Sequence, residues 1–261
     1  MPEGDTVFRT AERLRAALAG KTLTRSDFRV PRFATVDLSG EPVTEVGSYG
    51  KHLFIRTEKF SIHSHLKMEG AWRVFHCGQR WTKPRVTARV VLATDELEAV
   101  GFSLGTLELL RRADEHTVTD HLGPDLLGPN WDAEEALRRI ERYPRRPIGL
   151  ALLDQRVLAG IGNIYRSEIC FLRRVHPATP AGTIPDLPAL VDESHRVLHK
   201  AAHDPPWRAL VYGRARRPCP RCGTALRSAL LGEDDPGDSV TRHERGIYFC
   251  PRCQPDPDGD N

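Results

Sequence analysis

Two Cys-Pro-Arg-Cys motifs near the end of the chain limit its fold more than any other feature. The first contains Cys219 and Cys222, the second contains Cys250 and Cys253, and residues 223–249 lie between them. Each pair fits one tight knuckle, and four thiolates on two knuckles can enclose a single Zn²⁺ in a tetrahedron. Since four protein ligands leave no open coordination position, the predicted zinc is structural, and Lewis-acid catalysis is not expected of it.

The segment between the cysteine pairs is long enough for a β-hairpin, with the acidic residues Glu233 to Asp238 at its tip. A closed metal site on such a hairpin can hold an arginine rigidly where a small apolar core could not. The other two cysteines, Cys77 and Cys170, are isolated in the sequence and are expected to be ordinary thiols.

The composition is typical of a globular protein with one large or two modest domains. The chain has 261 residues, of which 39% are hydrophobic and 28% are charged, so there is room for a substantial core. No apolar run is long enough for a membrane-spanning helix, and the N-terminus lacks a basic stretch followed by an apolar one. We therefore expect an intracellular protein.

The distribution of charge is more informative than the net charge of +3. Between residues 208 and 222 there are several arginines and no acidic residue, which suits a phosphate-bearing partner, although a solvated arginine-rich surface is the commoner explanation of such a strip. The arginines are Arg208, Arg214, Arg216, Arg217 and Arg221.

Hydrophobic periodicity predicts a β-rich first part and a helical second part that meet near residue 125. A first helix over residues 6–18 is expected, with Asp5 or Thr6 as its cap. Alternating stretches between residues 22 and 110 are typical of a sandwich or barrel. The clearest strands are 52–56, 71–75 and 85–92. The predicted helices are 133–142, 147–158, 163–171 and 187–203.

A two-glycine turn joins two of the predicted helices. Gly160 and Gly162 tolerate positive φ and Asn163 is a good helix N-cap, so backbone amides of the turn could bind one anion. A tight corner between helices explains the same residues equally well. Neighbouring arginines favour a DNA backbone over this alternative. They are Arg145, Arg146, Arg156 and Arg166.

The N-terminus offers a nucleophile if Met1 is removed, which is usual before a residue as small as Pro2. The positive end of the first helix lowers the pKa of the exposed secondary amine from the ordinary value of about 8. Such an amine can attack C1′ of a deoxyribose, and the iminium formed as the base leaves promotes elimination of the 3′ phosphate. Glu3 is placed to act as the acid and base. Most N-termini are chemically inert, so Pro2 and Glu3 indicate catalysis only in combination with the other motifs.

Lys51 lies in a glycine turn that leads into a strand. A compact ammonium group at a hairpin tip could protonate a leaving base or engage a phosphate, although a surface lysine is the commoner case.

Taken together, these motifs resemble the formamidopyrimidine-DNA glycosylase/endonuclease VIII family, in particular its endonuclease VIII branch. The match runs in order from residue 2 to residue 254, and the combination is far more specific than any single motif. The motifs are Pro2-Glu3-Gly4, Gly50-Lys51-His52, His65 to Gly70, Leu153-Asp154-Gln155, Gly160 to Glu168, Tyr212-Gly213-Arg214 and the four-cysteine finger.

The resemblance implies an α+β multidomain fold with DNA bound in the cleft between domains. A β-sandwich with a flanking helix is expected over residues 1–123, and a helical domain with a helix-two-turns-helix element over residues 124–213. A four-cysteine zinc finger follows over residues 214–254, and a disordered tail over residues 255–261.

The function implied by the resemblance is that of a bifunctional DNA glycosylase and AP lyase of base excision repair. Such an enzyme excises oxidised bases through a Schiff base on the Pro2 amine, followed by β,δ-elimination. Damaged double-stranded DNA is the expected partner, one structural Zn²⁺ the expected cofactor, and neither a membrane nor a nucleotide cofactor is expected. We expect a monomer in the bacterial cytoplasm, associated with the nucleoid.

The resemblance also assigns catalytic roles. Pro2 matches the family's nucleophile, Glu3 matches its general acid/base, and Lys51 matches the hairpin lysine required for glycosylase action.

Five further residues match positions that serve DNA binding. Met68 matches the wedge that fills the gap left by a flipped nucleotide, and Asn163 matches the phosphate-binding asparagine of the two-turn element. Arg245 matches the zinc-finger arginine. Glu168 aligns with a carboxylate near the catalytic pocket, and Arg214 is grouped with these residues.

The chain departs from the formamidopyrimidine glycosylase pattern in three places. Asp5 and Thr6 stand where the family often has proline and glutamate, which leaves the relay role of that glutamate open. Val100 to Gly105 replaces a run whose arginine reads the base opposite the lesion. Weak discrimination for cytosine opposite 8-oxoguanine is therefore expected, and with Gly4 this favours oxidised pyrimidines as substrates. The interval between the cysteine pairs is longer than usual, so an extended hairpin tip is expected.

Two other functions compete with this one. A catalytically silent damaged-DNA-binding protein could keep the same cleft and finger, but the joint presence of Pro2, Glu3 and Lys51 argues against it. A metalloenzyme using His63 and His65 lacks a third ligand at a suitable spacing, and buried structural histidines are commoner. The sequence does not rank lesions, so bulky adducts and cross-links stay open.

Overall fold

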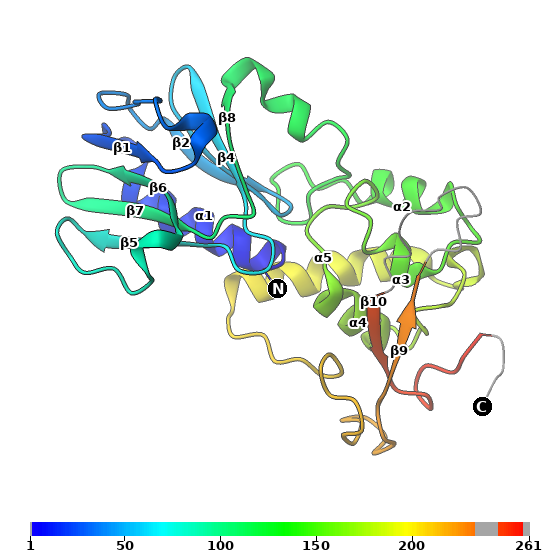
Figure 1. The fold of residues 1–261 in the computed structure, drawn as a ribbon. Coiled ribbons are helices and arrows are strands. Elements are labelled where there is room, and N and C mark those ends of the chain that lie inside the picture. Colours follow the sequence, from blue (N-terminus) through cyan, green and yellow to red (C-terminus); the bar gives the residue numbers. More distant parts are fainter. Residues whose placement is uncertain (1, 233–244, 258–261) are drawn as a thin grey trace. The chain divides into compact units, whose positions relative to one another are not determined.

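The computed structural model describes residues 2–232 and 245–257, and the chain forms two compact units, Met1–His121 and Leu122–Asn261. The first unit is β-rich and the second is mainly helical, as the sequence predicts (Figure 1). The predicted division of the second unit into a helical domain and a zinc finger at residue 214 stays a prediction.

The first unit confirms the predicted β-sandwich with a flanking helix. Helix α1 (Gly4–Leu18) packs with two antiparallel four-stranded sheets, ordered β1-β6-β7-β5 and β2-β3-β4-β8. The strands of the first sheet are β1 (Arg25–Phe28), β6 (Ala88–Ala93), β7 (Leu97–Phe102) and β5 (Ala71–His76). Those of the second sheet are β2 (Glu45–Tyr49), β3 (His52–Arg56), β4 (Phe60–His65) and β8 (Thr106–Arg111).

Side chains alternate across the second sheet, and this alternation creates one apolar and one polar face. Leu53 and Ile55 of β3 join Ile62 of β4 in the core beneath α1. Since successive strand residues point to opposite faces, His52 and Phe54 lie on the other side of the sheet. Short 3₁₀ helices complete the unit: η1 (Pro31–Phe33), η2 (Arg85–Thr87) and η3 (Arg112–Val118), the last packed on β4 and β8.

The start of α1 differs from the prediction. The helix begins at Gly4, so neither Asp5 nor Thr6 is its cap; both lie in the first turn, where Asp5 pairs with Arg9 at 2.9 Å. Glu3 is the N-cap residue, and its carbonyl accepts the first helical N–H bonds, from Thr6 and Val7. The predicted strand over 85–92 also begins later, at Ala88, because η2 occupies its first residues.

The second unit contains four α-helices and a two-stranded antiparallel sheet among its described residues. These elements are α2 (Ala133–Glu141), α3 (Ile148–Ala151), α4 (Asn163–Leu172), η4 (Ala181–Thr183), α5 (Leu187–His203), β9 (Arg227–Leu231) and β10 (Arg245–Phe249). Residues of α5 such as Val197 and Leu198 pack with Ile169 of α4 in its core. In the part of the chain that the structure describes, no helix is long and apolar enough to cross a membrane.

The predicted helix over residues 147–158 is wrong beyond its first turn. Only Ile148–Ala151 is α-helical. The Asp154 carboxylate accepts the backbone N–H of Arg156 at 2.9 Å and so forms a turn that competes with the helix.

Candidate functional site

The first two residues that the structure describes lie directly before α1. Pro2 is half-buried, and Glu3 is only 1% exposed, although it is a charged residue next to a chain end. A carboxylate is favoured beside the positive end of a helix, and the same field lowers the pKa of a nearby amine. Pro2 and the buried acid Glu3 therefore occupy consecutive positions at this helix end.

Lys51 occupies the predicted hairpin tip between β2 and β3. Tyr49 pairs with His52 across a two-residue turn, and Gly50 has a φ of +55° at the first position of that turn. Glycine is favoured there because the turn matches the twist of the strands only when this residue has positive φ. The turn fixes the backbone on both sides of Lys51, which is half-buried.

Three histidines lie next to this turn, on the polar face of the sheet. His52 and His63 are joined by a hydrogen bond of 2.9 Å between their rings, and His63 is joined to Glu108 by another of 2.9 Å. Burial and the charges of His63, His65, His121 and Lys51 lower the pKa of His52 to about 3. His52 is consequently neutral at pH 7.

His65 lies at the end of β4, in register with His52. Burial and the charge of Lys51 lower its pKa to about 4, so it is neutral as well. The predicted alternative of a metal site on His63 and His65 gains no support: within residues 2–232 and 245–257, the four finger cysteines are the one group of histidines, cysteines and acids that could hold an ion.

Met68 lies at the tip of the turn between β4 and β5. The N–H of Gly70 donates to the carbonyl of Leu66 at 3.0 Å, and Lys67 has a φ of +51°, so the turn is tight. Met68 is 68% exposed, which is unusual for a large apolar residue. This exposure is what a wedge into a DNA stack requires.

The two-glycine turn leads into α4 in a way that differs from the prediction. Gly160 has a φ of +116°, but Gly162 is extended and is itself the N-cap, so Asn163 is the first helical residue. The side-chain amide of Asn163 instead donates to the carbonyl of Gly246 in β10, over 2.8 Å. The buried guanidinium of Arg166 donates to the amide oxygen of Asn163 and holds the side chain in this position.

The arginines near this turn are mostly used within the protein. Arg146 and Arg156 both pair with Asp154, at 2.9 and 2.7 Å. Their hydrogen bonds outweigh the effect of burial and hold the pKa of the Asp154 carboxyl well below its usual range. Arg166 is fully buried. A buried Arg166 cannot face a DNA backbone as predicted, whereas for Arg145, Arg146 and Arg156 this contact stays a prediction.

Glu168 is fully buried in α4 and organises the segment that precedes Arg214. Its carboxylate accepts backbone N–H groups from Leu210, Val211 and Tyr212, at distances of 2.7 to 3.0 Å. Three N–H donors satisfy a buried carboxylate well, and each fixes one residue of the segment. Arg214 then closes the turn by donating to the Leu210 carbonyl at 3.0 Å.

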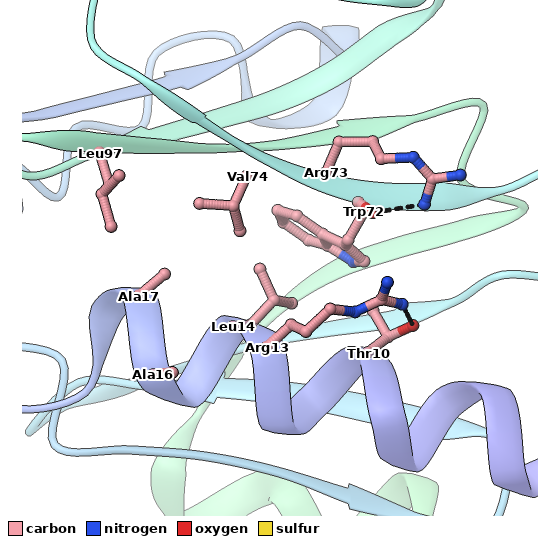
Figure 2. Close-up of a pocket in the computed structure, with 9 residues that line it drawn as sticks. All are labelled: Thr10, Arg13, Leu14, Ala16, Ala17, Trp72, Arg73, Val74 and Leu97. Atoms are coloured by element: carbon pink, nitrogen blue, oxygen red, sulfur yellow. Dashed lines mark hydrogen bonds between the residues drawn. The ribbon is translucent and has the colours of Figure 1, made fainter. Parts of the chain in front are cut away.

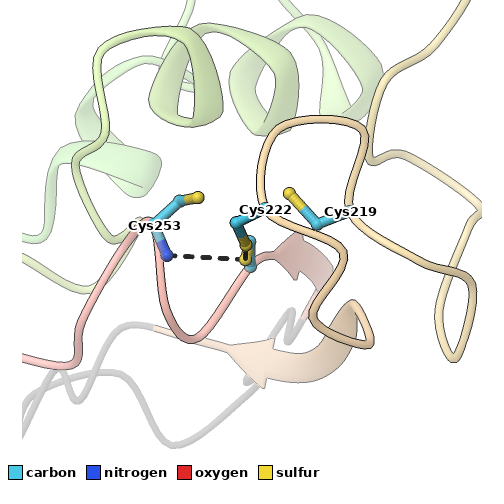
Figure 3. A group of neighbouring side chains, drawn as sticks. Cys219, Cys222 and Cys253 are labelled. Atoms are coloured by element: carbon cyan, nitrogen blue, oxygen red, sulfur yellow. Dashed lines mark hydrogen bonds between the residues drawn. The ribbon is translucent and has the colours of Figure 1, made fainter.

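The four predicted metal ligands lie together at the base of the β9-β10 hairpin. Their sulfur atoms are all within 4.8 Å of one another, and those of Cys222 and Cys250 are 3.5 Å apart. Figure 3 shows Cys219 and Cys222 on one knuckle and Cys253 on the other. Metal–sulfur bonds of about 2.3 Å place the sulfurs of a tetrahedron about 3.8 Å apart, so the four cysteines fit one ion.

The knuckles are anchored on α4 and on the loop that follows it. The Arg221 guanidinium lies 4.4 Å from the centre of the Phe171 ring and donates to the Phe171 carbonyl at 3.1 Å. Gln254 donates to the carbonyl of Val175 at 2.8 Å. Arg221 thus packs the finger against the helix while staying exposed, and the role of the cationic strip stays a prediction.

Arg245 is the first residue of β10, where its backbone pairs with Leu231. Its side chain, the predicted acidic hairpin tip at Glu233 to Asp238 and residues 258–261 of the predicted tail lie outside the described residues.

Comparison with known proteins agrees with this architecture. Residues 1–103 match the formamidopyrimidine-DNA glycosylase N-terminal domain, and residues 122–205 match the formamidopyrimidine-DNA glycosylase H2TH domain. A formamidopyrimidine DNA glycosylase of Lactococcus lactis, solved non-covalently bound to DNA containing an AP site, superposes with a TM-score of 0.81 over 97% of this chain and 100% of that one. Its sequence identity is 22%, so this likeness shows the fold alone.

Two bacterial relatives are more similar in sequence. The probable endonuclease 8 2 of Streptomyces coelicolor is 51% identical over 98% of this chain and 95% of its own length. The DNA-(apurinic or apyrimidinic site) lyase Nei2 of Mycolicibacterium smegmatis is 48% identical over 97% and 99%. This chain belongs to the formamidopyrimidine-DNA glycosylase/endonuclease VIII family.

Proposed function

We propose that this chain is a bifunctional DNA glycosylase and AP lyase of base excision repair, with the Pro2 amine as its nucleophile. The observation that carries the proposal is the burial of Glu3 directly after Pro2 at the start of α1. The two bacterial relatives, one named an endonuclease and the other an AP lyase, match 98% and 97% of the chain, which supports the same conclusion.

The reaction follows from these two groups. With Met1 removed, the neutral Pro2 nitrogen attacks C1′ of the damaged nucleotide and loses its proton, and the bond from C1′ to the base breaks. The ring bond from C1′ to O4′ then opens with protonation of O4′, and a protein–sugar iminium results. The iminium acidifies C2′, and loss of a C2′ proton expels the 3′ phosphate. A second elimination expels the 5′ phosphate. Glu3 is the adjacent group that gives and takes the protons of these steps.

Lys51 and Met68 complete the proposed N-terminal machinery. Lys51 lies at a hairpin tip beside His52 and His65, and the lowered pKa values of these two imidazoles keep both neutral at pH 7. We assign to it the proton for the leaving base. The exposed Met68 would fill the space left in the duplex by the flipped nucleotide.

Asn163, Arg245 and Arg214 are the proposed contacts to the DNA backbone. An amide nitrogen has two hydrogens, so Asn163 can bond Gly246 with one and a phosphate oxygen with the other. The same bond holds β10 beside α4 at the position where Arg245 begins the strand. Glu168 contributes indirectly, because it fixes the segment that ends at Arg214.

Zn²⁺ is the proposed metal of the cysteine site, because four thiolates in a closed tetrahedral set are typical of structural zinc. Such an ion would tie the two knuckles together and thereby the strands β9 and β10. No step of the reaction requires it.

Oxidised pyrimidines in double-stranded DNA are the proposed substrates, acted on by a monomer at the bacterial nucleoid. The link between β7 and β8 consists only of residues 103–105, and the stretch from Val100 to Gly105 carries no arginine. A short turn of this kind supports weak reading of the base opposite the lesion, although it does not rank the lesions themselves.

Reduction with borohydride in the presence of damaged DNA tests the proposal. The wild-type chain should form a covalent adduct with DNA containing thymine glycol or an abasic site, and Pro2→Gly, which replaces the secondary amine by a primary one, should form less of it. A matched control keeps the native sequence behind an uncleavable N-terminal extension, which turns the Pro2 nitrogen into an amide without changing a side chain. The absence of any wild-type adduct across a panel of oxidised, bulky and cross-linked lesions would refute the proposed function.

A further inference from the structure

A hydrogen-bonded chain of three side chains crosses the polar face of the second sheet next to Lys51. His52 on β3 is joined to His63 on β4, and His63 to Glu108 on β8, with a distance of 2.9 Å in each case. The rings of His52 and His63 have centroids 5.1 Å apart and planes only 11° from parallel, as an edge-to-edge hydrogen bond between ring nitrogens requires. His63, the ring in the middle of this chain, is 3% exposed and therefore shielded from water, while the Glu108 carboxylate is partly exposed.

The order of donors in this chain is fixed by the carboxylate at its end. A carboxylate of Glu108 accepts hydrogen bonds and cannot donate them, so Nδ1 of His63 carries a proton and donates to it. In the relay proposed below each imidazole has one N–H, so Nε2 of His63 accepts the Nδ1 proton of His52. His52 is then left with a lone pair on Nε2.

The surroundings of His52 suit a hydrogen-bond acceptor at its Nε2 atom. The ammonium group of Lys51 is close enough to affect the protonation of both His52 and His65. Nδ1 of His65 accepts the backbone N–H of Lys67 at 3.0 Å, so a neutral His65 carries its proton on Nε2. Among these rings, the lone pair of His52 Nε2 is therefore the basic atom that remains for the lysine.

We propose that Glu108 and His63 act as a positioning relay, which holds His52 with its Nε2 lone pair ready to accept a hydrogen bond from Lys51. The relay orients the ammonium group of Lys51 during base removal and allows Lys51 to keep its positive charge. This inference rests on the proposed role of Lys51 in the glycosylase step. A purely structural histidine pair would affect stability, but it would not separate base removal from strand cleavage.

Substitutions at Glu108 distinguish charge from geometry. Glu108→Gln keeps an oxygen that accepts from His63, whereas Glu108→Leu removes the acceptor. Imidazole ¹⁵N spectra of the full-length wild-type chain should show His52 and His63 protonated on Nδ1. Glu108→Gln should keep this pattern, and Glu108→Leu should lose it. Glu96→Leu, at an exposed residue of the turn between β6 and β7, is the matched control.

The kinetic part uses single-turnover excision from duplex DNA that contains thymine glycol. Glu108→Leu should slow base removal about tenfold at saturating DNA, while cleavage at a preformed abasic site changes by less than about twofold. Equal loss of both activities, or a changed tautomer with unchanged base removal, would overturn the positioning role. An inactive wild-type chain would instead count against the proposed function, and the spectra would still decide whether the relay exists.

A separate hollow in the first unit carries a second inference, which does not depend on the reaction. It lies between α1 and strands β5 and β7, about 15 Å along the helix from Pro2, and has a volume of about 410 Å³. Figure 2 shows the guanidinium groups of Arg13 and Arg73 at one end, and Val74 and Leu97 at the other. The hollow thus joins a cationic end to an apolar floor.

The two arginines make only neutral contacts in the described part of the chain. Arg13 donates to the hydroxyl of Thr10 at 3.3 Å, and Arg73 donates to the carbonyl of Trp72 at 3.1 Å. Burial and the charge of Arg73 lower the pKa of Arg13, so the two cations are close enough to repel each other. A carboxylate partner would relieve this repulsion and could bind a guanidinium through two bonds.

We infer that this hollow docks an acidic peptide segment of a partner protein, with a large apolar side chain next to its carboxylates. Phosphates of DNA would use Arg13 and Arg73 but would leave the apolar floor at Val74 and Leu97 open. An acidic peptide with a leucine or phenylalanine satisfies both ends of the hollow.

Fluorescence anisotropy with labelled peptides tests this inference on the full chain. The peptide Asp-Asp-Asp-Leu-Phe should bind with a micromolar Kd, and Asn-Asn-Asn-Leu-Phe and Asp-Asp-Asp-Ser-Ser should each bind about tenfold more weakly. Arg13→Glu and Arg73→Glu should reduce binding of the first peptide, and the exposed Arg80→Glu should not. Equal binding of all three peptides by the wild-type chain would overturn the inference. So would a loss of duplex DNA affinity in Arg13→Glu and Arg73→Glu when the wild-type chain binds none of the peptides.

Discussion

The side-chain amide of Asn163 donates a hydrogen bond of 2.8 Å to the carbonyl of Gly246. This bond links the first residue of α4 to β10, although the two residues are far apart in the sequence. It brings the predicted phosphate-binding asparagine next to the strand that Arg245 begins. Asn163 of the helical part and Arg245 of the finger therefore contribute to one proposed contact with the DNA backbone, instead of forming two independent contacts.

Replacing Asn163 tests this link. Asn163→Ala should lower the free energy of unfolding of the second unit by about 1 kcal/mol, because the Gly246 carbonyl loses a donor. The same change should weaken binding to DNA with an abasic-site analogue by about tenfold, as one phosphate contact is lost and β10 is less well held. Equilibrium binding and urea unfolding measure the two effects. The exposed Asn130→Ala is the control, and equal DNA affinity in both variants would contradict the assignment.

Removing one cysteine ligand should disturb the second unit and leave the first unit folded. Cys250→Ser should lose stoichiometric metal and most DNA affinity, because the energy of a structural zinc site is also folding energy of its finger. The first unit has its own core and should keep its hydrogen-exchange protection. Metal analysis and exchange mass spectrometry measure both, with the exposed Cys77→Ser as the control. Zinc retained at one ion per chain would refute the ligand set.

Glu3 is expected to matter more for base removal than for strand cleavage. Glu3→Gln cannot exchange a proton, so excision of an oxidised base should fall by at least about a hundredfold. A preformed abasic site already has a reactive carbon, so its cleavage should remain appreciable. Single-turnover assays on the two substrates measure this split, with Glu12→Gln on the same helix as the control. An equal loss of both activities would rule out the acid and base role.

Stability should fall on acidification because of His52 and His65. Their pKa values are lowered to about 3 and about 4, whereas an unfolded histidine has a pKa of about 6.5. The unfolded state therefore binds protons below pH 6.5 that the folded state does not bind. The contribution to stability is complete above that pH and is lost progressively as the pH falls.

Each histidine should reduce the free energy of unfolding by about 1 kcal/mol between pH 6.5 and pH 5, since both rings are partly exposed. Lys51 and His63 disfavour the protonation of both rings, and His121 also disfavours that of His52. Urea unfolding at several pH values measures the slope. His52→Phe keeps an aromatic ring but cannot titrate, and it should flatten the slope; an unchanged slope would mean that other groups cause the loss of stability in acid.

Much of the fold and of the metal site could be predicted because the signals are local. The spacing of Cys219, Cys222, Cys250 and Cys253 determines two knuckles regardless of the rest of the chain. The strand over His52–Arg56 and the helix over Leu187–His203 have the predicted bounds, since their apolar patterns are strong and their ends are marked. These elements follow the intrinsic periods of strands and helices.

The wrong predictions concern residues whose partners are chosen by the tertiary structure. Asp154 ends a helix and binds two arginines that the sequence offers equally well to DNA. Asn163 looks like a cap, but its side chain reaches Gly246 instead. The hydrogen-bonded relay of His52, His63 and Glu108 depends on the register of three strands, which no local pattern specifies. Alternating polar residues in β3 and β4 were the available signal for it.

The covalent bond between protein and DNA is the most direct evidence for the proposed chemistry. After borohydride reduction with abasic-site DNA, the wild-type adduct should be digested and the attachment point read by mass spectrometry. The modified peptide should begin at Pro2, with the added mass on its N-terminal nitrogen. Attachment to Lys51, or to any other side chain while Pro2 stays free, would show that the nucleophile has been assigned to the wrong residue.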